Sequence, residues 1–151
     1  MTMSTNELAQ ITRHSTEALA RAARELGDLV TWRPLDKGRS AFDQMQEVAG
    51  MAGMGKILIE TQAMPAMDRA AFTAFREKYD TPEKVFAVLE SASEEFAQAI
   101  EAMPEEKLGV VVTLPFAGGM DRTLGEFVML VYWNTVYHEG QINYIQTLAA
   151  E

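Results

Sequence analysis

The sequence predicts an all-α fold, an up-down four-helix bundle with one short extra helix. Apolar residues recur at helical spacing in four long segments, and helix start and stop signals bound each segment. β-branched residues gather in one short run, residues 110–114. The chain has 151 residues, of which 48% are apolar and 23% charged, so we expect one domain over residues 1–151 with a single core.

The first two predicted elements are a helix and a loop. The helix begins at Ser4 or Thr5, because either side chain can cap its free N–H groups, and it ends near Gly27. Residues 31–39, TWRPLDKGR, are expected to form a loop, because the proline and the glycine in this segment disfavour a helix.

The second predicted helix begins at Ser40 and runs to about Gln62. Its middle, AGMAGMG, is rich in glycine, which costs a helix about 1 kcal/mol per residue relative to alanine. We expect these glycines where another helix approaches closely. Glu47 shares a helix face with Met51 and Met54, so it either has a polar partner inside the protein or turns toward solvent.

Two more helices are predicted in the middle of the chain. Residues 67–79 form a short helix or helical connector. Thr81 and Pro82 begin a third long helix, because threonine caps well and proline suits the first helical position, and this helix runs to about Met103. Its outer, solvent-facing side carries the glutamates Glu90, Glu94, Glu95 and Glu101.

A short extended segment precedes the last helix. The β-branched run 110–114 and the glycine pair 118–119 predict an extended loop or a small hairpin rather than a sheet domain. Thr123 and Glu126 then form a capping box, so the last helix is expected to span residues 123–148.

The last helix carries a polar patch in the middle of an apolar face. Asn134, His138 and Gln141 fall on this face, and its apolar members are Phe127, Leu130, Val131, Ile142, Ile145 and Leu148. Burying such a patch without partners is costly, so it is either a satisfied core network or a site. Asn134 and His138 lie one turn apart, which is a common spacing for two metal ligands.

Composition and charge exclude several classes of function. The net charge is −9 and no cluster of lysine and arginine occurs, which argues against nucleic-acid binding. No run of about 18 apolar residues predicts a membrane span, and no signal peptide is evident, so we expect a cytoplasmic protein. The chain has no cysteine, so any metal would be held by histidine, carboxylate or amide oxygen.

Common catalytic motifs are also missing. Residues 138–142, HEGQI, begin like a zinc-protease HExxH motif, but Ile142 stands where the second histidine would be. No serine lies in a nucleophile-elbow context, and no glycine-rich loop has phosphate-binding spacing. No second inward-facing acid is evident to work with Glu47 in paired-carboxylate chemistry.

Three short motifs resemble those of the DinB-like superfamily, which includes YfiT-like metal-dependent hydrolases and bacillithiol- or mycothiol-dependent transferases. Residues 137–142, YHEGQI, are similar to the family's yHxGQi signature on the final helix. Residues 32–34, WRP, followed by Ser40, resemble its WxP…S segment, and residues 123–126, TLGE, resemble the start of its last helix. The resemblance covers nearly the whole chain.

The resemblance also implies where a metal would be bound. Family members usually hold a divalent metal with three histidines, one seven residues after the serine and two on the last helix. The corresponding residues here are Glu47, Asn134 and His138. Such a set could hold Zn²⁺, Ni²⁺ or Mn²⁺ more weakly than three imidazoles would. The alternative is a metal-free network, in which the Glu47 carboxylate accepts a hydrogen bond from the imidazole.

Two functions therefore remain open. One is an enzyme, a metal-dependent hydrolase or thiol-dependent transferase. With a metal, the ion would lower the pKa of its bound water or thiol. Without one, His138 would act as the base and Glu47 would orient it. The alternative is a non-catalytic module that binds a small apolar ligand or a partner through the same pocket. The sequence identifies neither the substrate nor the type of reaction.

The last helix also predicts a further contact. Val128, Met129, Tyr132 and Val136 lie on the side opposite the polar patch, so the helix is apolar on both sides and both should be covered. The short helix could cover the second side, or a second copy of the chain could. Members of the resembled family are commonly dimers, so we expect a homodimer.

Overall fold

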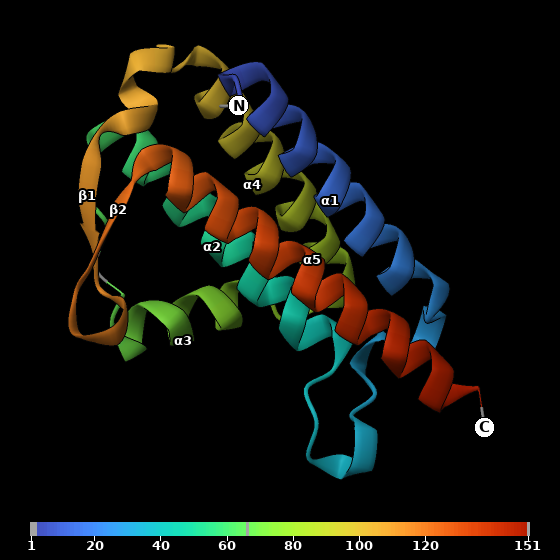
Figure 1. Ribbon diagram of the computed structural model, residues 1–151. Coiled ribbons are helices and arrows are strands. Elements are labelled where there is room, and N and C mark those ends of the chain that lie inside the picture. The colour runs from blue at the N-terminus through green and yellow to red at the C-terminus, as the bar shows by residue number, and fades with distance from the viewer. Residues whose placement is uncertain (1–2, 66, 151) are drawn as a thin grey trace.

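The computed structural model describes residues 3–65 and 67–150, and most of them are helical (Figure 1). The α-helices are α1 (Thr5–Glu25), α2 (Ala41–Thr61), α3 (Arg69–Lys78), α4 (Pro82–Ala102) and α5 (Leu124–Ala149). The strands are β1 (Val111–Leu114) and β2 (Met120–Thr123), and the short 3-10 turns are Gly27–Thr31, Pro34–Asp36, Glu105–Gly109 and Phe116–Gly118. The predicted all-α character is thus confirmed, with one small sheet added.

The predicted helix starts are confirmed by their caps. Ser4, Ser40 and Thr123 each accept a hydrogen bond from the backbone three residues later, within full capping boxes. Thr81 caps α4, whose first residue is Pro82. Local sequence therefore fixes where the long helices begin.

The segment before α5 is a hairpin, one of the two predicted alternatives. β1 and β2 pair antiparallel, with Leu114 opposite Met120. The side chains of Val112 and Leu114 point into the core, while Val111 is exposed. The hairpin therefore closes one end of the helical core.

The long helices do not alternate up and down along the chain as expected. α1 and α2 each pack against α4 and α5. One core cluster joins the start of α1 and of α5 to the end of α2 and of α4; its members include Leu8, Leu58, Ile100 and Phe127. α1 and α5 therefore run in one direction, and α2 and α4 run in the other (Figure 1).

The physical reason is the long connection between α2 and α4. Residues 62–81 include α3 and carry the chain back along α2, so that α4 starts at the same end as α2 (Figure 1). A 21-residue helix is about 31 Å long, and twenty residues easily span that length. Crossover connections of this kind occur in natural helical bundles.

α2 packs tightly against α4 at Gly55. A Cβ atom at this position would lie 2.7 Å from the ring of Phe96, which is fully buried. Phe96 in turn packs edge-on against Phe127 of α5, with ring centroids 6.5 Å apart. The expectation of a close helix contact in the glycine-rich segment is therefore confirmed at Gly55. A Cβ atom at Gly53 would meet nothing within 4 Å.

The outer side of α4 is acidic, as predicted, and its glutamates form ion pairs with neighbouring helices. Arg13 of α1 binds both Glu94 and Glu101, and Lys56 of α2 binds Glu95. These ion pairs lie at the surface, where each contributes little to stability.

The outer face of α5 differs in part from the expectation. Val128 is fully buried in the core rather than turned outward. The exposed apolar residues of α5 are Met129, Trp133, Val136, Tyr137 and Tyr144. The rings of Trp133 and Tyr137 stack with centroids 5.4 Å apart. α3 lies beside α2 and does not cover this face (Figure 1). None of the described helices is long and apolar enough to cross a membrane.

Candidate functional site

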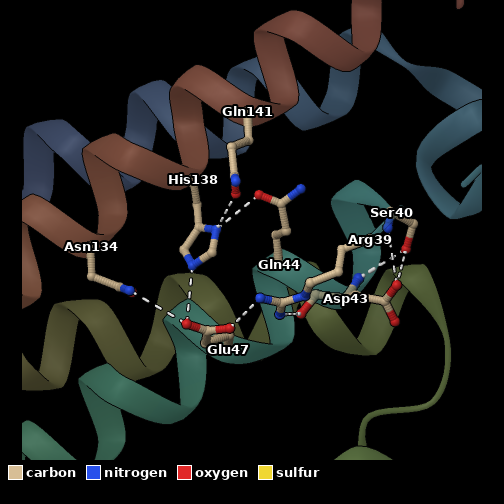
Figure 2. Close-up of polar contacts among 8 residues, drawn as sticks. All are labelled: Arg39, Ser40, Asp43, Gln44, Glu47, Asn134, His138 and Gln141. Atoms are coloured by element: carbon tan, nitrogen blue, oxygen red, sulfur yellow. Dashed lines mark hydrogen bonds and ion pairs between the residues drawn. The ribbon is translucent and has the colours of Figure 1, made fainter. Parts of the chain in front are cut away.

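The polar patch of α5 faces α2, and His138 lies at its centre (Figure 2). The His138 side chain is buried, with 3% of its surface exposed. Its Nδ1 lies 2.8 Å from Gln44 Oε1 and 2.9 Å from Gln141 Oε1, and its Nε2 lies 3.1 Å from Glu47 Oε1. The three partner atoms are oxygens, so each ring nitrogen of His138 faces at least one hydrogen-bond acceptor.

Glu47 connects this network to its surroundings. Its Oε1 also accepts a hydrogen bond from Asn134 Nδ2 at 3.4 Å, and its Oε2 pairs with Arg39 Nη1 at 2.6 Å (Figure 2). The hydrogen bond from His138, and after it the ion pair with Arg39, lower the pKa of Glu47 to about 2. The carboxylate therefore stays ionised through the neutral and mildly acidic range.

The structure brings together the three residues that the sequence singled out, Glu47, Asn134 and His138. The sequence left open whether Glu47 has a polar partner inside the protein or turns toward solvent. Both are true, because it contacts polar side chains inside while 36% of its side chain stays exposed. These contacts extend across the interface between α2 and α5. The contact between Glu47 and the His138 imidazole, on which the network alternative depends, is thus present.

Two residues of the network were missed by the sequence analysis, Gln44 and Arg39. Gln44 is 2% exposed and lies three residues before Glu47, so the helical period places both on one face. That spacing was a usable signal. Arg39 precedes the cap residue of α2, and its Nη2 also donates to the carbonyl oxygen of Asp43 at 3.2 Å. A side chain that folds back along a helix in this way leaves no periodic signal.

A cleft of about 660 Å³ opens beside the network, between α2 and α3. Glu47 belongs to its lining as well as to the network. The apolar lining from α2 consists of Met51, Met54 and Ile57, together with Gly50 and Gly53. α3 contributes Phe72, Phe75 and Arg76. Glu47 and Arg76 are the charged residues among the described lining residues.

α3 covers this cleft without joining the core. None of its residues is buried, although its Phe75, and Tyr79 directly after it, pack against the core cluster near the start of α2. Gln46 of α2 is 5% exposed and donates to the carbonyl oxygens of Tyr79 at 2.8 Å and Arg76 at 3.4 Å. These two hydrogen bonds attach the C-terminal end of α3 to α2.

The donor set does not fit a divalent metal in this arrangement. Both ring nitrogens of His138 and both carboxylate oxygens of Glu47 contact protein groups. The Arg39 guanidinium already neutralises the charge of Glu47, where a metal ion would have to bind. In the described part of the chain, no three His, Cys, Asp or Glu side chains are placed so that they could share a metal ion. One observation favours a bound group instead. Asn134 Oδ1 is buried and accepts no hydrogen bond from any described residue.

Comparison with known proteins does not place the chain in a family: no protein-family model matches it, and no curated protein does. The resemblance to the DinB-like superfamily stays a prediction that rests on the three motifs.

Proposed function

We propose that this chain is a DinB-like four-helix bundle that binds a small, mainly apolar molecule in the cleft between α2 and α3. The observation that carries the proposal is that Glu47 belongs both to the polar network and to the lining of the cleft. Its carboxylate closes a buried polar network on one side and borders an apolar cleft on the other. A few polar groups at the edge of an apolar cavity of this size are typical of small-molecule sites.

The composition of the lining supports this function. Methionine side chains adapt to ligands of irregular shape, and Met51 and Met54 both border the cleft. Phe72 borders it too and is 44% exposed, so a ligand would remove its ring from water. The network keeps Glu47 at a fixed place, which pre-organises the polar end of the site.

Binding of a neutral apolar fluorophore, phenylnaphthylamine, tests the proposal. A leucine at position 53 would fill the cleft without meeting other atoms near its Cβ, so Gly53→Leu should raise the dissociation constant at least tenfold. Gly53→Ala is the matched control, because it adds a single methyl group and should keep most of the binding. Equal binding by the two variants and the natural chain would exclude the cleft as the site.

A second candidate is a metal-dependent hydrolase or thiol-dependent transferase. It is favoured by Asn134 Oδ1, which is buried and accepts no hydrogen bond from the residues that the structure describes. For such a site the Glu47–His138 hydrogen bond must break and Arg39 must move away. Catalysis without a metal would likewise need His138 to release one of its partners before it could act as a base. Metal content after purification without chelators distinguishes this candidate from the first.

We further infer that the exposed apolar face of α5 is the interface of a homodimer. Stacked aromatic rings are frequent at protein interfaces, and Trp133 and Tyr137 supply such a pair. Gly140 lies on the same helix, and a Cβ atom there would meet nothing within 4 Å, so the backbone of a second copy could come close.

A further inference from the structure

We propose that the ligand of the α2–α3 cleft is an amphipathic carboxylate, with its apolar body against the two helices and its anionic head at Arg76. This inference rests on the proposed function, because it names the class of molecule that the same cleft takes. It depends on how the two charged lining residues are paired and on where they lie along the cleft.

The first step is the charge that the protein leaves unpaired. Glu47 has three partners, since His138 and Asn134 donate to one oxygen and Arg39 to the other. Arg76 makes no ion pair with any residue that the structure describes. The charge available to a ligand in the cleft is therefore positive. A guanidinium binds a carboxylate with two parallel hydrogen bonds, which is a stronger and more directional contact than a single one.

The second step is the position of Arg76. Its backbone carbonyl oxygen accepts from Gln46 Nε2, so this turn of α3 is held beside the turn of α2 that carries Glu47. Phe75 lies next to it, with its ring 3.9 Å from the place of a Cβ atom on Gly50. The head of a ligand therefore belongs at this end of the cleft, which is the end with both charges.

The third step is the room for an apolar body. From Glu47 to Ile57 the cleft follows ten residues of α2, which is about 15 Å. Beyond Glu47, the α2 residues that border the cleft over this length are methionine, isoleucine or glycine. A volume of about 660 Å³ lies within the usual range of roughly 300–1,000 Å³ for ligand sites. An alkyl chain or a small aromatic body fits this shape, with its charged group at one end only.

Three ligands with the same decyl chain test the proposal by titration calorimetry, each below its micelle concentration. Decanoate carries an anionic head, decanol a neutral one and decyltrimethylammonium a cationic one. We expect decanoate to bind at least tenfold more tightly than the other two. Arg76→Gln should lower the affinity for decanoate to that for decanol, and the decanol binding that remains shows that the cleft of the variant is intact.

Two further variants complete the experiment. Arg69→Gln is the matched control, because Arg69 is an exposed arginine of α3 that does not border the cleft, so decanoate should keep its advantage. Gly53→Leu should weaken all three ligands. Tighter binding of the cationic ligand, or a preference for decanoate that survives Arg76→Gln, would overturn the anionic-head assignment and leave the proposed function standing. If none of the three ligands binds, both the inference and the proposed function fail.

Discussion

Glu47 on α2 and His138 on α5 are joined by a hydrogen bond of 3.1 Å between Oε1 and Nε2. The two residues lie 91 positions apart in the chain, so this contact fixes how the two helices face each other. The imidazole is buried while part of the carboxylate borders the cleft. The pair therefore links the core of the protein to its candidate site.

The first prediction concerns how stability depends on pH. The folded-state pKa of Glu47 is lowered from its ordinary value of 4.5 to about 2, so its contribution is fully present above pH 4.5 and is lost as the pH falls toward 2. Because the carboxylate is partly exposed, we expect Glu47→Gln to lower the free energy of unfolding by only about 1 kcal/mol at pH 7. Urea unfolding should show this difference shrinking between pH 4.5 and pH 2.5.

The control for this pH dependence is Glu106→Gln. Glu106 is an exposed glutamate in the turn after α4, so its replacement should change stability little at any pH. A Glu47→Gln deficit that stays the same from pH 7 to pH 2.5 would contradict the assignment of the shift to Glu47.

The second prediction compares two glycines of α2. Gly55→Ala would press a methyl group against the buried ring of Phe96, and such overpacking costs about 1–3 kcal/mol, more than the helix gains from alanine. Gly53→Ala meets no other atom and should stabilise the protein by up to about 1 kcal/mol. Urea unfolding of the two variants should therefore give changes of opposite sign. Equal changes would mean that α2 does not approach α4 at Gly55.

The third prediction concerns the homodimer. Light scattering of the natural chain at micromolar concentration should give twice the chain mass of 16.8 kDa. Trp133→Glu should give the mass of one chain, because it places a charge in the apolar face of α5, where 60% of the Trp133 side chain is exposed. Leu35→Glu is the control, since Leu35 is an exposed apolar residue of another segment and its replacement should leave the dimer intact. A natural chain that is monomeric would exclude the dimer.

The fourth prediction tests the metal. Zn²⁺, Ni²⁺ and Mn²⁺ should leave the Tm of the natural chain unchanged, because Arg39 and the protein hydrogen bonds already engage Glu47 and His138. The double variant Glu47→His, Asn134→His restores the three histidines of the resembled family. Metal at a hundred times its Kd should raise the Tm of that variant by about 5–10 °C. A metal-dependent rise in the natural chain would favour the second candidate function instead.

Much of the local structure could be predicted from the sequence. Helix starts depend on the side chains of a few neighbouring residues, so Ser40 and Thr123 were recognisable as caps. The polar patch was equally visible, because the helical period alone places Asn134 and His138 on one face.

The direction of α4 and the cleft could not be predicted in the same way. Periodicity shows which face of a helix is buried but not which helix covers it, and a connection as long as residues 62–81 allows either direction for α4. The cleft arises because α3 touches α2 through Phe75 and Gln46 rather than through a continuous apolar stripe. Arg39 reaches Glu47 only because its flexible side chain turns back over the start of α2.

The tethering of α3 has a consequence for the kinetics of binding. A helix without buried residues, held by two hydrogen bonds from Gln46 and a few aromatic contacts, can separate locally at a small cost in free energy. The four long helices keep their mutual contacts when this happens, since α3 contributes little to the core. On the proposed function, we therefore expect ligands to enter and leave the cleft through local opening of α3 rather than through unfolding of the whole protein.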